Sequence, residues 1–250
     1  MLAHQQQDGT VLRVFTDAYG GRSRPPYAPP GAPGQGLNLG SHVGDDPHAV
    51  AANRSLLAAR VGVDASRLVF LNQVHGAEVV QVDGPCSGPA GDADGVVTTR
   101  PDLALAVLVA DCTPVLLADP QAGVVGAAHA GRPGMLAGVV PATVAAMRDL
   151  GARDITAHVG PSVCGRCYEV PEQMQQDAAQ RVPESAARTW SGTPAIDVAT
   201  GVVSQLSALG VPVTWVPGCT VEQDRFFSYR RSGATGRFGG VVVRRERGSR

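Results

Sequence analysis

Two histidines and one cysteine, His75, Cys112 and His129, stand at the ends of short apolar runs in this sequence of 250 residues. Apolar runs bounded by turn residues are typical of buried strands, so each of these side chains is expected at a strand end. Imidazole and thiolate are ligands of zinc, and three such ligands with an open fourth position are typical of a catalytic zinc site. Two alternatives remain open. The histidines could be core residues with their hydrogen bonds made, beside a buried thiol, or Cys112 could be a nucleophile with His129 as its base.

The stretch 103–135 predicts how the cysteine meets the second histidine. It contains the longest apolar runs of the chain, and the turn sequence DPQAG joins two of them. If this turn closes a hairpin, counting back along both strands sets Cys112 opposite residue 129 or 130. Pro114 cannot donate to a strand ladder, so the backbone is expected to break beside Cys112. The sequence therefore predicts that Cys112 and His129 are neighbours.

Strands and helices alternate along the chain without a long linker. The class expected is therefore α/β (α+β), a single layered domain over residues 1–250 with mixed β-sheets flanked by helices. Strands are expected at 11–15, 68–74, 78–82, 96–99, 103–109, 115–118, 124–128, 155–159, 213–216 and 241–244, and helices at 47–60, 135–150, 171–181 and 197–209.

Composition and charge exclude several classes of partner. The net charge is −1 and aromatic residues make up 4% of the chain, so neither nucleic acid nor an anionic membrane is an expected partner. No apolar stretch reaches the roughly 18 residues that span a bilayer, and the first residues do not read as a secretory signal. Five scattered cysteines do not resemble a disulfide framework. A reducing cytoplasm is the expected location, and a monomer the expected state.

Other residues could take part in chemistry, each with a simpler explanation beside it. The pair Cys164-x-x-Cys167 could be redox-active or half of a zinc site, but a lone pair of this kind is usually structural. Asp94 could orient a ligand or form an Asx turn. Arginines near glycine-rich turns suit phosphate or carboxylate binding, although solvation explains most single ones. These arginines are Arg54, Arg132, Arg230, Arg231 and Arg237.

Seven segments together carry a family resemblance. In chain order they are GLNLGSHVGDD, NQVHG, DADG, ADCTPVLLAD, AAHAG, GPSVCGRCYEV and FFSYRRSGATGR. In this order the chain resembles the YfiH-like family over nearly its whole length. Members of that family were long described as multicopper polyphenol oxidases (laccases) and are now described as zinc-dependent purine nucleoside phosphorylases. The resemblance implies a cytotoxic necrotizing factor/YfiH-like fold.

The resemblance also implies an activity and its residues. A Zn²⁺ ion would be held by His75, Cys112 and His129, which would form the catalytic centre. The implied reactions are phosphorolysis of adenosine, inosine, guanosine and methylthioadenosine, and deamination of adenosine, with a purine nucleoside and inorganic phosphate as partners. One branch of the family is linked to the removal of wrongly incorporated residues from peptidoglycan precursors. The residues expected to contact substrate are Asn38, Arg54, Asp94, Arg132, Tyr229 and Arg230.

One motif departs from the family pattern. The family continues its histidine motif as HAGWRG, whereas this chain reads HAGRPG, with Arg132 in place of Trp and Pro133 in place of Arg. Arg132 either replaces the family arginine from a shifted position or the contact is lost. Laccase chemistry is not expected as the main activity, because laccase copper sets use several His-x-His pairs and the six histidines form none.

Two further functions stay open at this point. One is a cysteine hydrolase (amidase) editing a peptidoglycan precursor, with Cys112 as nucleophile and His129 as base. The other is a non-enzymatic binding protein in which zinc is only structural. A side chain closing the fourth position would favour the second, and activity in metal-free protein would favour the first.

Overall fold

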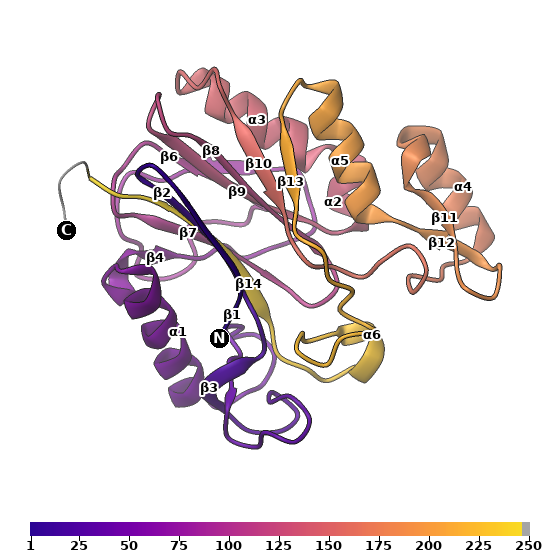
Figure 1. Ribbon diagram of the computed structural model, residues 1–250, viewed down its shortest axis with the longest axis horizontal. Coiled ribbons are helices and arrows are strands. Elements are labelled where there is room, and N and C mark those ends of the chain that lie inside the picture. The colour runs from indigo at the N-terminus through magenta and orange to yellow at the C-terminus, as the bar shows by residue number, and fades with distance from the viewer. Residues whose placement is uncertain (247–250) are drawn as a thin grey trace.

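Two β-sheets packed face to face form the centre of the computed structural model, which describes residues 1–246 (Figure 1). The first sheet consists, in spatial order, of β1 (Leu2–Asp8), β2 (Val11–Thr16), β14 (Phe238–Arg244), β7 (Ala104–Val109) and β4 (Leu68–Val69). The second consists of β13 (Val213–Trp215), β10 (Thr156–Val159), β8 (Thr113–Asp119), β9 (Val124–Ala130), β6 (Gly95–Thr98) and β5 (Val79–Gln81).

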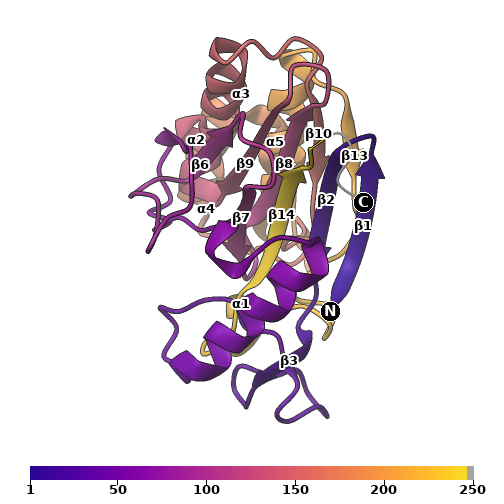
Figure 2. The ribbon, with the colours of Figure 1, turned by 90° about the vertical axis from the view of Figure 1, so that its left-hand side faces the viewer.

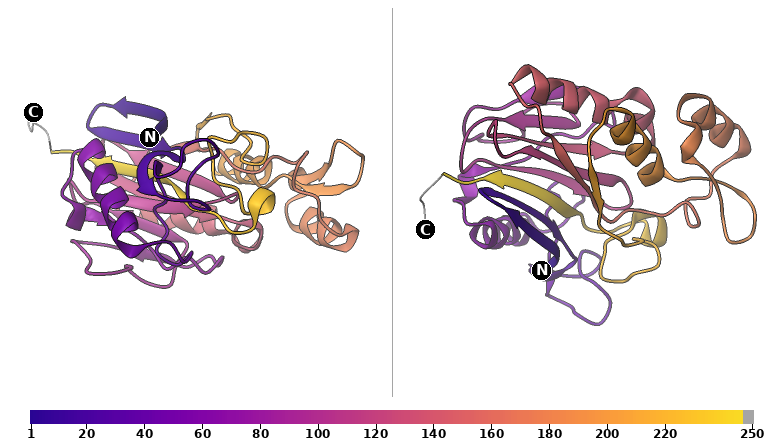
Figure 3. Two further views of the ribbon diagram at one scale, coloured as in Figure 1. Left: turned by 90° about the horizontal axis from the view of Figure 1, so that it is seen from below. Right: turned by 45° about the horizontal axis from the view of Figure 1, so that its top comes forward.

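Helices cover the outer faces of both sheets (Figure 2). The α-helices are α1 (Pro47–Val61), α2 (Arg132–Ala137), α3 (Val139–Asp149), α4 (Glu172–Arg181), α5 (Val198–Ala208) and α6 (Tyr229–Ser232). Helix α1 packs on the first sheet, and α3 and α5 pack on the second. Three short strands and two 3-10 helices complete the elements: β3 (Tyr19–Ser23), β11 (Ala186–Arg188), β12 (Pro194–Ile196), η1 (Ala65–Arg67) and η2 (Pro183–Ser185). Helix α4 and the β11–β12 pair extend from one end of the molecule (Figure 3). The expected class, α/β with mixed sheets flanked by helices, is confirmed.

Three apolar layers hold this arrangement together. Leu105 and Leu116 belong to the layer between the sheets, Leu57 to the layer under α1, and Val144 to the layer under α3. Strands β7, β8 and β9 are buried at every position, so their sequences read as continuous apolar runs instead of alternating ones. The strand ends that carry Cys112 and His129 are therefore fixed by the most deeply buried part of the chain.

The central hairpin forms as expected, with a small difference in register. Strands β8 and β9 are antiparallel and pair Thr113 with Ala130 and Pro114 with His129. The expected position of Cys112 opposite residue 129 or 130 is therefore wrong by at least one residue, and Cys112 lies just before the first pair. The backbone break is at residues 110–112, where Asp111 has a φ of 107°. Pro114 itself lies inside β8, where its carbonyl accepts a hydrogen bond from the Gly160 amide at 2.9 Å.

Some elements differ from expectation for local reasons. The run 68–74 pairs as a strand only at Leu68–Val69, because beyond it the Gln73 side chain takes over the pairing with the backbone of Leu108. The helix expected at 135–150 is two helices, since Gly138 adopts a left-handed φ of 89° between them. Strand β1 was not expected because its QQQ sequence lacks apolar alternation. Among residues 1–246, no helix has the length and apolar content needed to cross a membrane.

Candidate functional site

His75, Cys112 and His129 come together although they belong to separate elements. His75 lies in the loop after β4, Cys112 in the turn between β7 and β8, and His129 near the end of β9. The Cys112 Sγ is 3.7 Å from His75 Nε2, and the two imidazole rings meet edge to face with centroids 4.8 Å apart. The three potential ligand atoms all lie within 4.8 Å of one another. The prediction that Cys112 and His129 are neighbours is confirmed.

A buried carboxylate orients this group. Asp94 Oδ1 lies 2.7 Å from His129 Nδ1, which leaves the Nε2 of His129 for the side of Cys112. The other oxygen of Asp94 accepts hydrogen bonds from the backbone amides of Val74, at 3.2 Å, and Gly76, at 2.6 Å. One fully buried carboxylate therefore positions His129 directly and the His75 loop through its backbone. A carboxylate behind a histidine is the usual support of a metal-binding imidazole.

The backbone around the group is adapted to close packing. His75 has a positive φ of 62°, which is uncommon for a residue with a side chain. A Cβ on Gly131 would lie 2.6 Å from the ring of His75 and 3.2 Å from the sulfur of Cys112, so only glycine fits there. Strained backbone and close approach of this kind concentrate at functional sites.

The three groups shift one another's proton affinity. Burial raises the pKa of Cys112, but the neighbouring imidazoles of His129 and His75 lower it by more, to about 6. Burial lowers the pKa of His129, but the Cys112 thiolate and the Asp94 carboxylate raise it by more, to about 9. At neutral pH the sulfur is therefore a thiolate, the form that binds metals and attacks electrophiles.

A cavity of about 750 Å³ opens over the group. His75, Cys112 and His129 line it, and three of the six residues expected to contact substrate, Arg132, Tyr229 and Arg230, line it as well. Apolar and aromatic side chains form other parts of its wall. These include Leu71, Leu108, Val109, Val163 and Tyr168.

The other three expected substrate contacts do not line this cavity. Asn38 is fully buried and binds the backbone of Gly40 and the carboxylate of Asp45. The Arg54 guanidinium donates to the Leu39 carbonyl at 2.9 Å and stacks on a phenylalanine ring. Asp94 acts on His129, as described above. Their roles in this structure are to hold the loops and ligands that form the site.

Four titratable residues that line the cavity were on neither the expected substrate list nor the expected ligand list. His42, Asp111, Tyr168 and Arg237 line the cavity, and Arg230 stacks over the Tyr168 ring at 4.7 Å. Asp111 anchors the wall, because its carboxylate accepts hydrogen bonds from the Thr220 hydroxyl and the Arg230 amide, each at 2.7 Å. The family segments quoted above contain all four residues, but periodicity does not indicate where loop side chains point.

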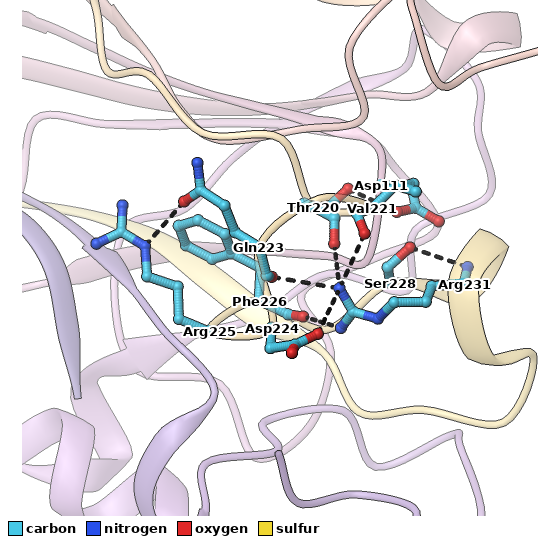
Figure 4. A network of polar contacts seen from close by, with 9 residues as sticks. All are labelled: Asp111, Thr220, Val221, Gln223, Asp224, Arg225, Phe226, Ser228 and Arg231. Atoms are coloured by element: carbon cyan, nitrogen blue, oxygen red, sulfur yellow. Dashed lines mark hydrogen bonds and ion pairs between the residues drawn. The ribbon is translucent and has the colours of Figure 1, made fainter. Parts of the chain in front are cut away.

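Arg231, a candidate for anion binding by sequence, has a different role. Its guanidinium donates to the carbonyls of Thr220, Val221, Gln223 and Phe226 and pairs with a neighbouring carboxylate (Figure 4). These contacts use the side chain to fold the loop that precedes α6. Its neighbour Arg230 is exposed and faces the cavity instead.

The departure in the HAGRPG motif is accommodated by the start of α2. Arg132 begins this helix and Pro133 follows in its first turn, where no backbone N–H is needed for the helix ladder. Arg132 lines the cavity, so an arginine is present on this wall despite the changed order.

These features define a class of site: three potential nitrogen and sulfur ligands of a metal ion, supported by a buried carboxylate, at the floor of a cavity with cationic and apolar walls. The chain matches, over residues 12–245, the family model described as multi-copper polyphenol oxidoreductase laccase. It is 56% identical over 239 residues to a protein of Streptomyces griseus named purine nucleoside phosphorylase, and the match covers 94% of each chain.

Solved structures give the same assignment. A Neisseria meningitidis protein of the DUF152 family superposes with a TM-score of 0.84 at 33% identity, covering 98% of this chain and 99% of that one. The YfiH protein of Bacillus licheniformis gives a TM-score of 0.84 at 30% identity, with 94% and 93% covered. The chain belongs to this YfiH/DUF152 family.

Proposed function

We propose that the protein is a zinc-dependent purine nucleoside phosphorylase. The observation that carries the proposal is the three-ligand group His75, Cys112 and His129 at the floor of a cavity that arginines also line. The Streptomyces griseus relative named purine nucleoside phosphorylase supports the same reaction class. A cationic wall suits the phosphate of a phosphorolysis, and a metal-binding floor suits the activated water of a deamination.

The residues present fit zinc. Two imidazole nitrogens and one thiolate are a ligand set that zinc accepts, and the low pKa of Cys112 supplies the thiolate at neutral pH. The third ligand, His129, is already oriented through its other nitrogen by Asp94. His75, Cys112 and His129 would hold the ion, which when bound supplies Lewis acidity at the cavity floor.

The arginines are suited to phosphate. Arg132, Arg230 and Arg237 line the cavity, and within residues 1–246 none of their guanidinium groups forms an ion pair with a carboxylate. Arg237 Nη1 donates to the carbonyls of Thr235, at 3.1 Å, and Gly236, at 3.0 Å. The charges of the three side chains and their remaining donors are available for a dianion. We propose that they bind inorganic phosphate and hold it against the ribosyl carbon as the purine leaves.

The uncharged wall is suited to a purine. Tyr168 and Tyr229 offer ring faces, and Leu108 and Val163 add apolar contacts. His42 also lines the cavity, and its pKa is lowered by burial and by the nearby Arg237 and Arg54, so it is neutral at pH 7 and can exchange hydrogen bonds with a base. The substrates proposed are adenosine, inosine, guanosine and methylthioadenosine, with deamination of adenosine as a second reaction.

The test is a phosphate-dependent assay on the purified protein. Adenosine, inosine and methylthioadenosine are supplied with and without phosphate, and free purine and ribose 1-phosphate are measured together with zinc content. We expect purine release that depends on phosphate and yields the sugar phosphate. The proposal would be contradicted if purine release did not depend on phosphate. It would also be contradicted if zinc-loaded protein released no purine from any of these nucleosides.

A second candidate function rests on the chain of contacts Asp94, His129 and Cys112. A thiolate beside an imidazole that a carboxylate orients is also the arrangement of a cysteine hydrolase. Such an enzyme would act as an amidase on a peptidoglycan precursor and would need no metal. Amidase activity that survives zinc removal and is lost on alkylation of Cys112 would favour it over the phosphorylase.

A further inference from the structure

A second group of metal-ligating side chains lies outside the site described above. It consists of Cys164, Cys167, Cys219 and Glu222, whose three sulfurs and one carboxylate oxygen all lie within 4.8 Å of one another. Cys219 is buried, Cys164 and Cys167 are half-buried and Glu222 is exposed. None of the four lines the cavity over His75, Cys112 and His129.

The first two ligands are presented by one tight turn. The amides of Cys167 and Tyr168 both donate to the Cys164 carbonyl, at 2.9 and 3.0 Å, which curls the chain so that both thiols belong to one group. Gly165 is needed inside this turn, since a Cβ there would lie 2.8 Å from the side chains of Ala187 and Asp197. A pair of cysteines with two residues between them in a tight turn is the usual half of a structural zinc site.

The third ligand arrives from a loop more than fifty positions along the chain. A short parallel bridge joins Ser162 to Cys219, with Ser162 N donating to Gly218 O at 3.2 Å and Thr220 N donating to Ser162 O at 3.1 Å. Beyond the bridge, the Arg231 guanidinium donates hydrogen bonds to backbone carbonyls of the loop that carries Cys219, and so fixes this loop (Figure 4). Cys219 is therefore held against the Cys164 turn by backbone contacts on both sides.

The fourth ligand already contacts the group. The Cys167 thiol donates to Glu222 Oε1 at 3.3 Å, and the same oxygen accepts a hydrogen bond from the Trp190 indole at 3.4 Å. A metal ion bound here would replace this thiol–carboxylate contact, because a thiol gives up its proton when it becomes a metal ligand.

We propose that Cys164, Cys167, Cys219 and Glu222 bind a second zinc ion, distinct from the one at His75, Cys112 and His129. Four protein ligands close the coordination shell, so this ion is structural. On binding, the three thiols lose their protons to solvent and the metal bonds replace the thiol–carboxylate contact. The ion ties the loop 160–170 to the loop 216–228. Tyr168, which directly follows Cys167, and Arg230, in α6 just after the second loop, stack on each other in the cavity wall.

The proposal is tested by zinc content and thermal unfolding of the purified full-length protein and three variants. Wild type is expected to contain about two zinc ions per chain, and Cys112→Ala and Cys219→Ser about one each. Cys219→Ser should also lower Tm, because the loops lose their cross-link. Cys86→Ser is the matched control, since Cys86 belongs to neither group, and should keep both ions and the wild-type Tm.

A second measurement keeps the test decisive if Cys219→Ser does not fold. Cobalt is loaded into Cys112→Ala, where only the second group can give the intense absorption of tetrahedral cobalt thiolate. Glu222→Gln in that background should weaken cobalt binding and shift the fluorescence of Trp190. Three results would each overturn the proposal. The first is a single zinc ion in wild type that is lost in Cys112→Ala, the second is no cobalt–thiolate absorption, and the third is a disulfide within the group in freshly purified protein.

Discussion

The two groups of potential metal ligands in this protein differ in what surrounds them. His75, Cys112 and His129 are held near the ends of core strands, and a buried carboxylate orients one of them. Cys164, Cys167, Cys219 and Glu222 are held by two loops tied together by backbone hydrogen bonds. Three potential ligands facing a cavity would leave a position for substrate, whereas four away from it would leave none. The number of ligands and their access to the cavity therefore distinguish the proposed catalytic site from the proposed structural site.

The largest expected effect is a separation of activity from stability. Cys112→Ala should reduce turnover by at least about a hundredfold and lower Tm by less than Cys219→Ser does, because its site lies at the ends of core strands that pack without the ion. Cys219→Ser should do the reverse, with a lower Tm and most of the turnover kept. Steady-state kinetics and calorimetry on both variants check this pair. Full turnover in Cys112→Ala would remove the contrast altogether.

The next effect concerns the carboxylate that only the first group has. Asp94→Asn should lower zinc affinity or turnover by about tenfold to a hundredfold, because His129 loses its orienting partner. Asp92→Asn is the control, since Asp92 is exposed and binds only the side chain of Asn72 at 2.7 Å. Zinc titration of both variants measures the difference. Equal behaviour of the two would show that Asp94 does not position the ligand.

A smaller effect should appear in the reactivity of the thiols of metal-free protein. The pKa of Cys112 is lowered to about 6, so its thiolate forms as pH rises through about 6. The pKa values of Cys164 and Cys167 are raised, so both remain thiols at pH 7. Iodoacetamide at pH 7 should therefore alkylate Cys112 about tenfold faster or more. Peptide mapping by mass spectrometry measures the rates, and equal rates would contradict this electrostatic difference.

The smallest effect tests the cavity wall over the first group. Arg237→Met should raise the KM for phosphate by about tenfold with a smaller change in kcat, because one charge-assisted contact is lost. Arg225→Ala is the control, since Arg225 is exposed and does not line the cavity. Phosphate titration at saturating nucleoside gives both constants. An unchanged KM in Arg237→Met would exclude this residue from the phosphate site.

Much of the site could be predicted from local patterns, and the exceptions are instructive. The adjacency of Cys112 and His129 followed from one hairpin, because a hairpin turn brings nearby residues together. The register was wrong by at least one residue, because Asp119, which the sequence places in the turn, pairs with Val124 as part of the strand. Arg54 and Arg231 could not be separated in advance from Arg132, because solvation, backbone binding and ligand binding use the same side chain.

The sequence by itself determined the buried strands, the central hairpin, the start of α1 at Pro47 and the end of α4 at Arg181. Apolar periodicity and turn chemistry act over short distances, so local sequence is enough to specify these features. Only the tertiary structure decided which distant residues meet. Asp94 reaches His129 because β6 pairs with β9. Cys219 reaches Cys164 because the backbone at Cys219 forms a bridge to Ser162, which is far away in the sequence. Such contacts depend on how sheets and loops pack together, and no local pattern encodes that packing.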